Sequence, residues 1–116
     1  MNYKGSCHCG KISFEVEGEL EQIMECNCSI CSRKGYLLWM VPRENLILLT
    51  PEANLATYTF NKHKIKHRFC PTCGCAPFGE GAHPKSGDLV AAINVRCLEN
   101  IEISTLTRKQ VDGRSL

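Results

Sequence analysis

Cysteine constrains this chain more than any other residue, because nine occur among 116 residues and eight of them fall into three short clusters. The clusters are Cys7/Cys9, Cys26/Cys28/Cys31 and Cys70/Cys73/Cys75, and Cys97 stands alone. The first residues lack the apolar core of a signal peptide, and no run approaches the roughly 18 apolar residues that span a bilayer. We therefore expect a cytoplasmic protein without membrane contact, whose reduced thiols serve as metal ligands rather than as disulfides.

The remaining composition predicts a globular protein with one domain over residues 1–116. Hydrophobic residues make up 43% and charged residues 22%, as in folded rather than disordered chains. The formal net charge is +2. Four thiolates around one Zn²⁺ add −2 and three around another add −1, which would bring the net charge to about −1. This balance gives no reason to expect a nucleic-acid partner.

Apolar residues follow the pattern of strands through most of the chain. Ile12, Phe14 and Val16 alternate with polar residues, which predicts a strand with one buried face. Residues 36–41 are apolar throughout and predict a strand buried on both faces. Other strands are expected at residues 20–26, 46–49, 56–60, 65–69, 76–78 and 89–95, with one helical turn at 29–34 and a loop at 79–87. The sequence therefore predicts a mostly β fold with little helix.

The turn from Cys70 to Gly74 is the strongest single metal-binding motif. Cys70 and Cys73 enclose a proline and precede a glycine, which lets backbone N–H groups point at the sulfurs. Such a turn supplies two ligands, and the pair Cys7/Cys9 is its natural partner. Four thiolates would close a tetrahedral structural zinc site that ties distant parts of the chain together. The alternative is that the two pairs serve unrelated purposes.

Cys26, Cys28 and Cys31 predict a second zinc site with different chemistry. Three protein thiolates leave one tetrahedral position open, and an open position distinguishes a reactive zinc from a structural one. Such a site suits a small exogenous thiol, which it would keep nucleophilic toward a carbon electrophile such as an aldehyde. The three cysteines are therefore candidate catalytic residues as well as metal ligands.

Three residues beside this cluster leave alternatives open. Arg33 and Lys34 follow Cys31 directly, and they either grip a carboxylate on the thiol or form a solvated pair. Asn27 either orients a ligand or stabilises its own turn.

Cys75 is the cysteine whose role matters most for this second site. It could replace Cys73 in the first site, or it could complete the cluster of three and close the reactive position. Cys97 follows an apolar strand and is expected to be a small core residue. The four histidines are isolated and are expected on the surface or in turns.

The ordered motifs give the chain a specific family resemblance, carried by residues 5–10 (GSCHCG), 26–35 (CNCSICSRKG) and 69–74 (FCPTCG). Together they resemble the glutathione-dependent formaldehyde-activating enzyme family, which includes centromere protein V-like domains. Residues 94–98 and 112–115 also look like the C-terminal part of that family. Two departures stand out, because the chain looks shorter than the founding enzyme and carries Cys75 where relatives more often have a small or polar residue.

The resemblance implies an Mss4-like fold of small antiparallel sheets held by two zinc ions. It places one zinc on Cys7, Cys9, Cys70 and Cys73, and the other on Cys26, Cys28 and Cys31. It also implies a zinc-dependent carbon–sulfur lyase resembling S-(hydroxymethyl)glutathione synthase, with glutathione and a small aldehyde as partners. The alternative is a non-catalytic, zinc-built module that binds protein or nucleic acid.

Overall fold

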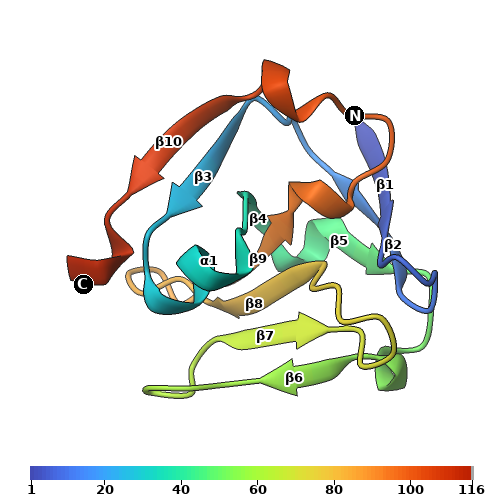
Figure 1. The fold of residues 1–116 in the computed structure, drawn as a ribbon, viewed down its shortest axis with the longest axis horizontal. Helices are drawn as coiled ribbons and strands as arrows, with labels where there is room; N and C mark the ends of the chain where they lie inside the picture. Colours follow the sequence, from blue (N-terminus) through green and yellow to red (C-terminus); the bar gives the residue numbers. More distant parts are fainter. Residues whose placement is uncertain (116) are drawn as a thin grey trace.

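The computed structural model describes residues 1–115, and within them the chain forms ten strands in two sheets (Figure 1). The smaller sheet has the order β1-β2-β5, and the larger one the order β10-β3-β4-β9-β8-β7-β6. The strands are β1 Asn2–Ser6, β2 Ser13–Glu17, β3 Gln22–Cys26, β4 Leu38–Pro42, β5 Leu46–Leu48, β6 Ala56–Tyr58, β7 Lys66–Phe69, β8 Phe78–Ala82, β9 Leu89–Asn94 and β10 Thr107–Val111.

Helical structure is confined to short pieces. The α-helix α1, Ser29–Lys34, ends at Gly35, whose left-handed backbone (φ 68°) lets its N–H close the last turn on Cys31 O at 2.9 Å. The 3₁₀ turns are η1 Arg43–Asn45, η2 Glu52–Asn54, η3 Val95–Cys97, η4 Ile103–Thr105 and η5 Gly113–Ser115. Within the described part of the chain, every helix is too short or too polar to cross a membrane.

The main core lies between the two sheets. Phe14 and Val16 of the smaller sheet are fully buried against Trp39, Ala91 and Ile93 of the larger one. These positions alternate along their strands with residues that point the other way, as the period of a pleated strand requires. The larger sheet therefore has an inner face that packs on the core and an outer face that does not.

The register of the larger sheet shows what lies on that outer face. One row of directly paired residues crosses five strands on this face. In order, the row consists of Met40, Ala92, Gly79, His67 and Tyr58. Met40 is 44% exposed, so the prediction that residues 36–41 are buried on both faces is wrong. An uninterrupted apolar run predicts a strand buried on both faces. Here Trp39 and Val41 face the core, whereas Leu38 and Met40 lie on the outer face.

The mostly β prediction with little helix is confirmed, as is the helical turn at Ser29–Lys34. The predicted loop at residues 79–87 is partly wrong, because β8 runs through Phe78–Ala82 and pairs with strands on both sides. Its two glycines give this segment a low β-propensity, but backbone hydrogen bonds to the strands on both sides hold it in the sheet. The pairing of β10 with β3 is parallel, which joins the C-terminal strand to the strand that ends at Cys26.

A buried ion-pair cluster links β7, β8 and η1. Glu80 accepts hydrogen bonds from Arg43 and Arg68, both at 2.7 Å, and Arg68 also contacts the exposed Glu52 at 3.3 Å. Burial opposes ionisation of Glu80, but the two guanidinium groups outweigh it and hold the pKa of this carboxyl below its usual value. The cluster therefore needs an ionised Glu80.

Glu80→Gln should lower the free energy of unfolding by about 3 kcal/mol, because it leaves the buried Arg68 charge without its main partner. Glu52→Gln is the matched control on the same arginine, and it should cost less than about 1 kcal/mol because Glu52 is exposed. Urea unfolding at neutral pH measures both. Equal losses for the two variants would contradict this account of the cluster.

Candidate metal centres

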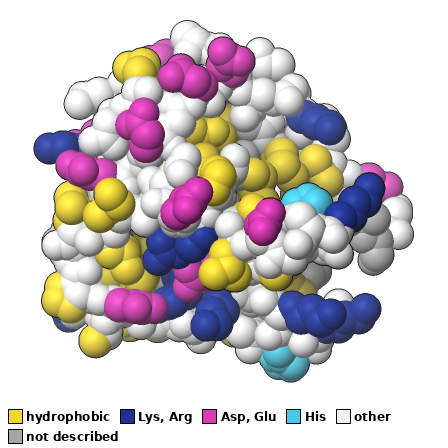
Figure 2. Space-filling view, turned by 180° about the vertical axis from the view of Figure 1, so that it is seen from behind, with side chains coloured by type: hydrophobic (Ala, Val, Ile, Leu, Met, Phe, Trp, Pro, Cys, Tyr) yellow, Lys and Arg dark blue, Asp and Glu magenta, His cyan; other side chains and the backbone are white. Residues whose placement is uncertain are grey.

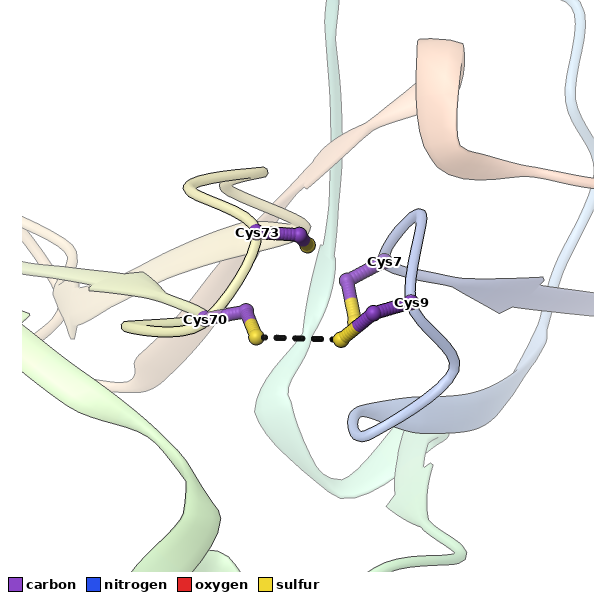
Figure 3. Close-up of side chains that lie close together, drawn as sticks. All are labelled: Cys7, Cys9, Cys70 and Cys73. Atoms are coloured by element: carbon purple, nitrogen blue, oxygen red, sulfur yellow. Dashed lines mark hydrogen bonds between the residues drawn. The ribbon is translucent and has the colours of Figure 1, made fainter.

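Two turns bring Cys7, Cys9, Cys70 and Cys73 together, with their sulfurs pointing toward one another (Figure 3). All four sulfurs lie within 4.8 Å of one another, and the Cys7–Cys9 and Cys9–Cys70 separations are 3.7 and 3.6 Å. A tetrahedral zinc with Zn–S bonds of about 2.3 Å requires sulfurs ~3.8 Å apart. The separations fit that geometry, and they are far too long for a disulfide.

Backbone N–H groups favour thiolates at this cluster. The Ile12 N–H donates to Cys7 Sγ at 3.3 Å. The N–H groups of Cys75 and Cys9 lower the pKa of Cys73 to about 5, and the Cys73 N–H lowers the pKa of Cys70. The lowered pKa values of Cys70 and Cys73 therefore favour the thiolate forms that bind a cation.

Cys75 lies with this cluster and not with the cluster of three. Its side chain packs, partly buried, against the buried group that contains Cys7 and Cys70, and its carbonyl accepts the Cys70 N–H at 2.9 Å. Cys97 packs against the main core as predicted, and burial raises the pKa of its thiol to about 11. Among the described residues, neither thiol joins a group with metal-ligand spacing.

The second cluster forms where β3 turns into α1. Cys26 is the last residue of the strand, Cys28 caps the helix and Cys31 lies in its first turn. Their sulfurs lie within 4.8 Å of one another, and the Cys28 N–H donates to Cys26 Sγ at 3.4 Å. Cys31 is buried, whereas Cys26 and Cys28 are only half-buried. The three sulfurs can therefore hold one soft metal ion that stays accessible from one side.

The surroundings separate these three thiols by acidity. Burial opposes ionisation of Cys28, but hydrogen bonds led by the Cys31 N–H lower the pKa of its thiol overall. Burial and the neighbouring Cys28 raise the pKa of Cys31 well above its usual value. Without a metal, this cluster favours one thiolate at Cys28, and a metal ion would have to displace the remaining protons.

The C-terminal segment closes against this second cluster. Asn27 donates from Nδ2 to Asp112 Oδ1 at 2.8 Å, and its Oδ1 accepts the Arg114 N–H at 2.9 Å. These bonds hold Gly113 against the cysteine cluster. A Cβ atom added to Gly113 would lie only 2.5 Å from Cys26 Sγ. Asn27 therefore holds the tail in place, and Gly113 contacts the cluster in a way that the local sequence does not reveal.

Two adjoining pockets flank the second cluster on the outer face of the larger sheet. A pocket of about 310 Å³ is lined by all three cysteines, and a neighbouring one of about 560 Å³ is lined by Arg33 and Lys34. The two pockets share Ile30, Tyr36, Phe60 and His67. The accessible side of the cysteine cluster therefore leads into a cavity with a basic end and an apolar end.

His67 departs from the expectation that the histidines lie on the surface or in turns. It is half-buried in β7, where it stacks on Phe60 with ring centroids 5.4 Å apart. Burial lowers the pKa of its imidazole, and the nearby Lys34 lowers it further. The pattern of β7 places this ring on the outer face, between the two pockets.

Gly113→Ala should weaken metal binding at the second cluster by about tenfold or more, because the new methyl group must displace Cys26 or the tail. Gly87→Ala is the control, since it strains a left-handed glycine with nothing within 4 Å. Zinc content per chain, measured against a graded chelator, separates the variants. Unchanged zinc retention in Gly113→Ala would show that the tail does not brace the cluster.

This chain is similar to known proteins in both structure and sequence. A crystal structure of a Rhodobacter sphaeroides protein, a structural-genomics target, superposes with a TM-score of 0.77 at 28% sequence identity, covering 91% of this chain and 99% of that one. The family model described as glutathione-dependent formaldehyde-activating enzyme matches residues 2–110, which include both cysteine clusters. The chain therefore belongs to the glutathione-dependent formaldehyde-activating enzyme family.

Proposed function

We propose that this protein is a zinc-dependent carbon–sulfur lyase that interconverts a small thiol plus an aldehyde with their S-(hydroxyalkyl) adduct. The observation that carries the proposal is the position of Cys26, Cys28 and Cys31, whose sulfurs converge at the wall of a pocket rather than in a closed core. A structural zinc site has four protein ligands and needs no access to a pocket, whereas a catalytic zinc keeps one position open. The family supports glutathione as the thiol and formaldehyde as the simplest aldehyde.

The chemistry needs a deprotonated thiol held beside a carbonyl carbon. A zinc ion on the three cysteines would bind that thiol and keep it nucleophilic near neutral pH. In the forward direction the sulfur bonds to the carbonyl carbon, the C=O electron pair moves to the oxygen, and that oxygen takes a proton. The reverse direction breaks the same C–S bond and restores the thiol and the aldehyde.

Arg33 and Lys34 suit the thiol's tail. Both line the larger pocket, and glutathione carries two carboxylates. Arg33 Nη1 already donates to Ser29 O at 3.0 Å, and Lys34 Nζ lies 5.9 Å from the Phe69 ring centroid. Both basic groups are therefore anchored near α1, within the pocket that adjoins the cysteine cluster.

The cluster of Cys7, Cys9, Cys70 and Cys73 takes the structural role in this proposal. It would bind a second zinc with all four positions filled, so it offers no place for a thiol. Its contribution is to fix the β7–β8 turn against the β1–β2 turn. Two zinc ions per chain would then have separate tasks.

A mixed surface charge supports this enzyme over a nucleic-acid-binding module. On the face shown in Figure 2, acidic side chains lie among the basic ones. A nucleic-acid reader needs a basic stripe that follows the phosphates. A salt-dependent shift of DNA or RNA by this protein would favour the module instead.

Cys28→Ser should abolish glutathione binding while the protein keeps one zinc on the other cluster. Isothermal titration of glutathione, together with zinc content, measures both results. Cys97→Ser is the matched control, because Cys97 lies in neither group with metal-ligand spacing, and it should bind glutathione like the unaltered protein. If Cys28→Ser binds glutathione equally well, the thiol site is elsewhere and the proposed mechanism is wrong.

A further inference from the structure

The floor of the smaller pocket is an apolar surface formed by the outer face of the larger sheet. Met24, Leu38, Met40, Val90 and Ala92 line it from three neighbouring strands, and the register places Met24 opposite Leu38 and Met40 opposite Ala92. The cysteine cluster lies in the wall of the same pocket. An apolar surface thus begins where the reacting atoms would meet.

Two polar side chains along this pocket, Glu80 and Asn94, already have hydrogen-bond partners within the protein. Glu80 is held by Arg43 and Arg68, as described above. Asn94 donates from Nδ2 to Ala76 O at 3.0 Å, and its Oδ1 accepts the Arg96 N–H at 3.2 Å. A polar substituent placed beside these two residues and the apolar side chains would lose its hydrogen bonds to water without replacement, whereas a hydrocarbon chain would gain by leaving water.

The size of the pocket also exceeds what the simplest aldehyde needs. Its volume is about 310 Å³, whereas a water molecule takes up about 30 Å³ in the liquid. Formaldehyde has only two non-hydrogen atoms, so it would leave most of the pocket unfilled. The thiol does not account for the space either, since its carboxylates suit the basic end beside Arg33 and Lys34.

We propose that this pocket binds the hydrocarbon chain of the aldehyde, so that the protein prefers straight-chain apolar aldehydes over formaldehyde. This inference rests on the proposed function, because it concerns the electrophile at the same cysteine cluster. The bond changes are those given above, with the apolar chain carried on the carbonyl carbon. Each buried methylene should strengthen binding about threefold to fivefold.

S-Alkyl glutathiones test the pocket without turnover, because their thioether cannot release an aldehyde. The dissociation constant, measured by calorimetry, should be at least tenfold lower for S-hexylglutathione than for S-methylglutathione. Added S-hexylglutathione should also shift the NMR signals of the Met24 and Met40 methyl groups. Equal affinities for the two compounds would overturn the inference.

Two substitutions locate the effect in the pocket. Ala92→Leu fills the centre of the apolar surface, and Met40→Glu places a charge at its exposed edge, where folding should tolerate it. Either change should reduce the advantage of the hexyl compound to threefold or less. Ala53→Leu is the control, since Ala53 is exposed and lies outside the lining. A hexyl advantage that survives in both pocket variants would contradict the inference.

Catalysed exchange between glutathione and its aldehyde adducts separates this inference from the proposed function. NMR exchange rates, with the uncatalysed rate subtracted, should rise from formaldehyde to hexanal. Catalysis that is equal for all aldehydes would overturn the inference and leave the function standing. No catalysis with any aldehyde, despite tight S-hexylglutathione binding, would overturn the function and leave the apolar site.

Discussion

The convergence of four sulfurs from two distant turns is the constraint on which the rest of the structure depends. Cys7 and Cys9 lie in the turn between β1 and β2 of the smaller sheet, and Cys70 and Cys73 in the turn between β7 and β8 of the larger one. A metal ion among them would cross-link two sheets whose inner faces meet through apolar packing, at turns that the Lys11 Nζ–Thr72 Oγ1 hydrogen bond of 3.1 Å already joins. In a chain of 116 residues such a link supplements a small core.

That cross-link would leave the second cluster free for a different task. Because the smaller sheet covers the inner face of the larger one, the outer face stays available for the two pockets and for α1. The three sulfurs lie at the junction of these features, braced by Asn27 and Gly113. One sheet thus provides a packed face for stability and an open face with two pockets.

Local patterns in the sequence predicted a large part of this arrangement. Alternation predicted β2, and cysteine spacing predicted both groups that the structure brings together. Spacing works within each turn because two ligands on one tight turn converge whatever the rest of the fold does. The pairing of Cys7/Cys9 with Cys70/Cys73 was predicted from the four ligands that a structural zinc needs. The helical turn at Ser29–Lys34 was predicted as well.

What the sequence did not reveal depends on distant contacts. Strand β1 has little alternation and owes its place to pairing with β2, and β8 is rich in glycine but paired on both sides. The apolar run of β4 did not show that Leu38 and Met40 face a pocket, because an apolar side chain suits a core or a binding surface equally. The contact of Gly113 with Cys26 joins residues far apart in the sequence.

The central claim is that one cysteine cluster is closed and the other has a position open to a thiol. X-ray absorption at the zinc edge, on protein loaded with two zinc ions, tests it directly by counting sulfur ligands. The account predicts an average of about 3.5 sulfurs per zinc, rising to about 4 when glutathione is added. An average of 4 before glutathione, or no rise after it, would contradict the account.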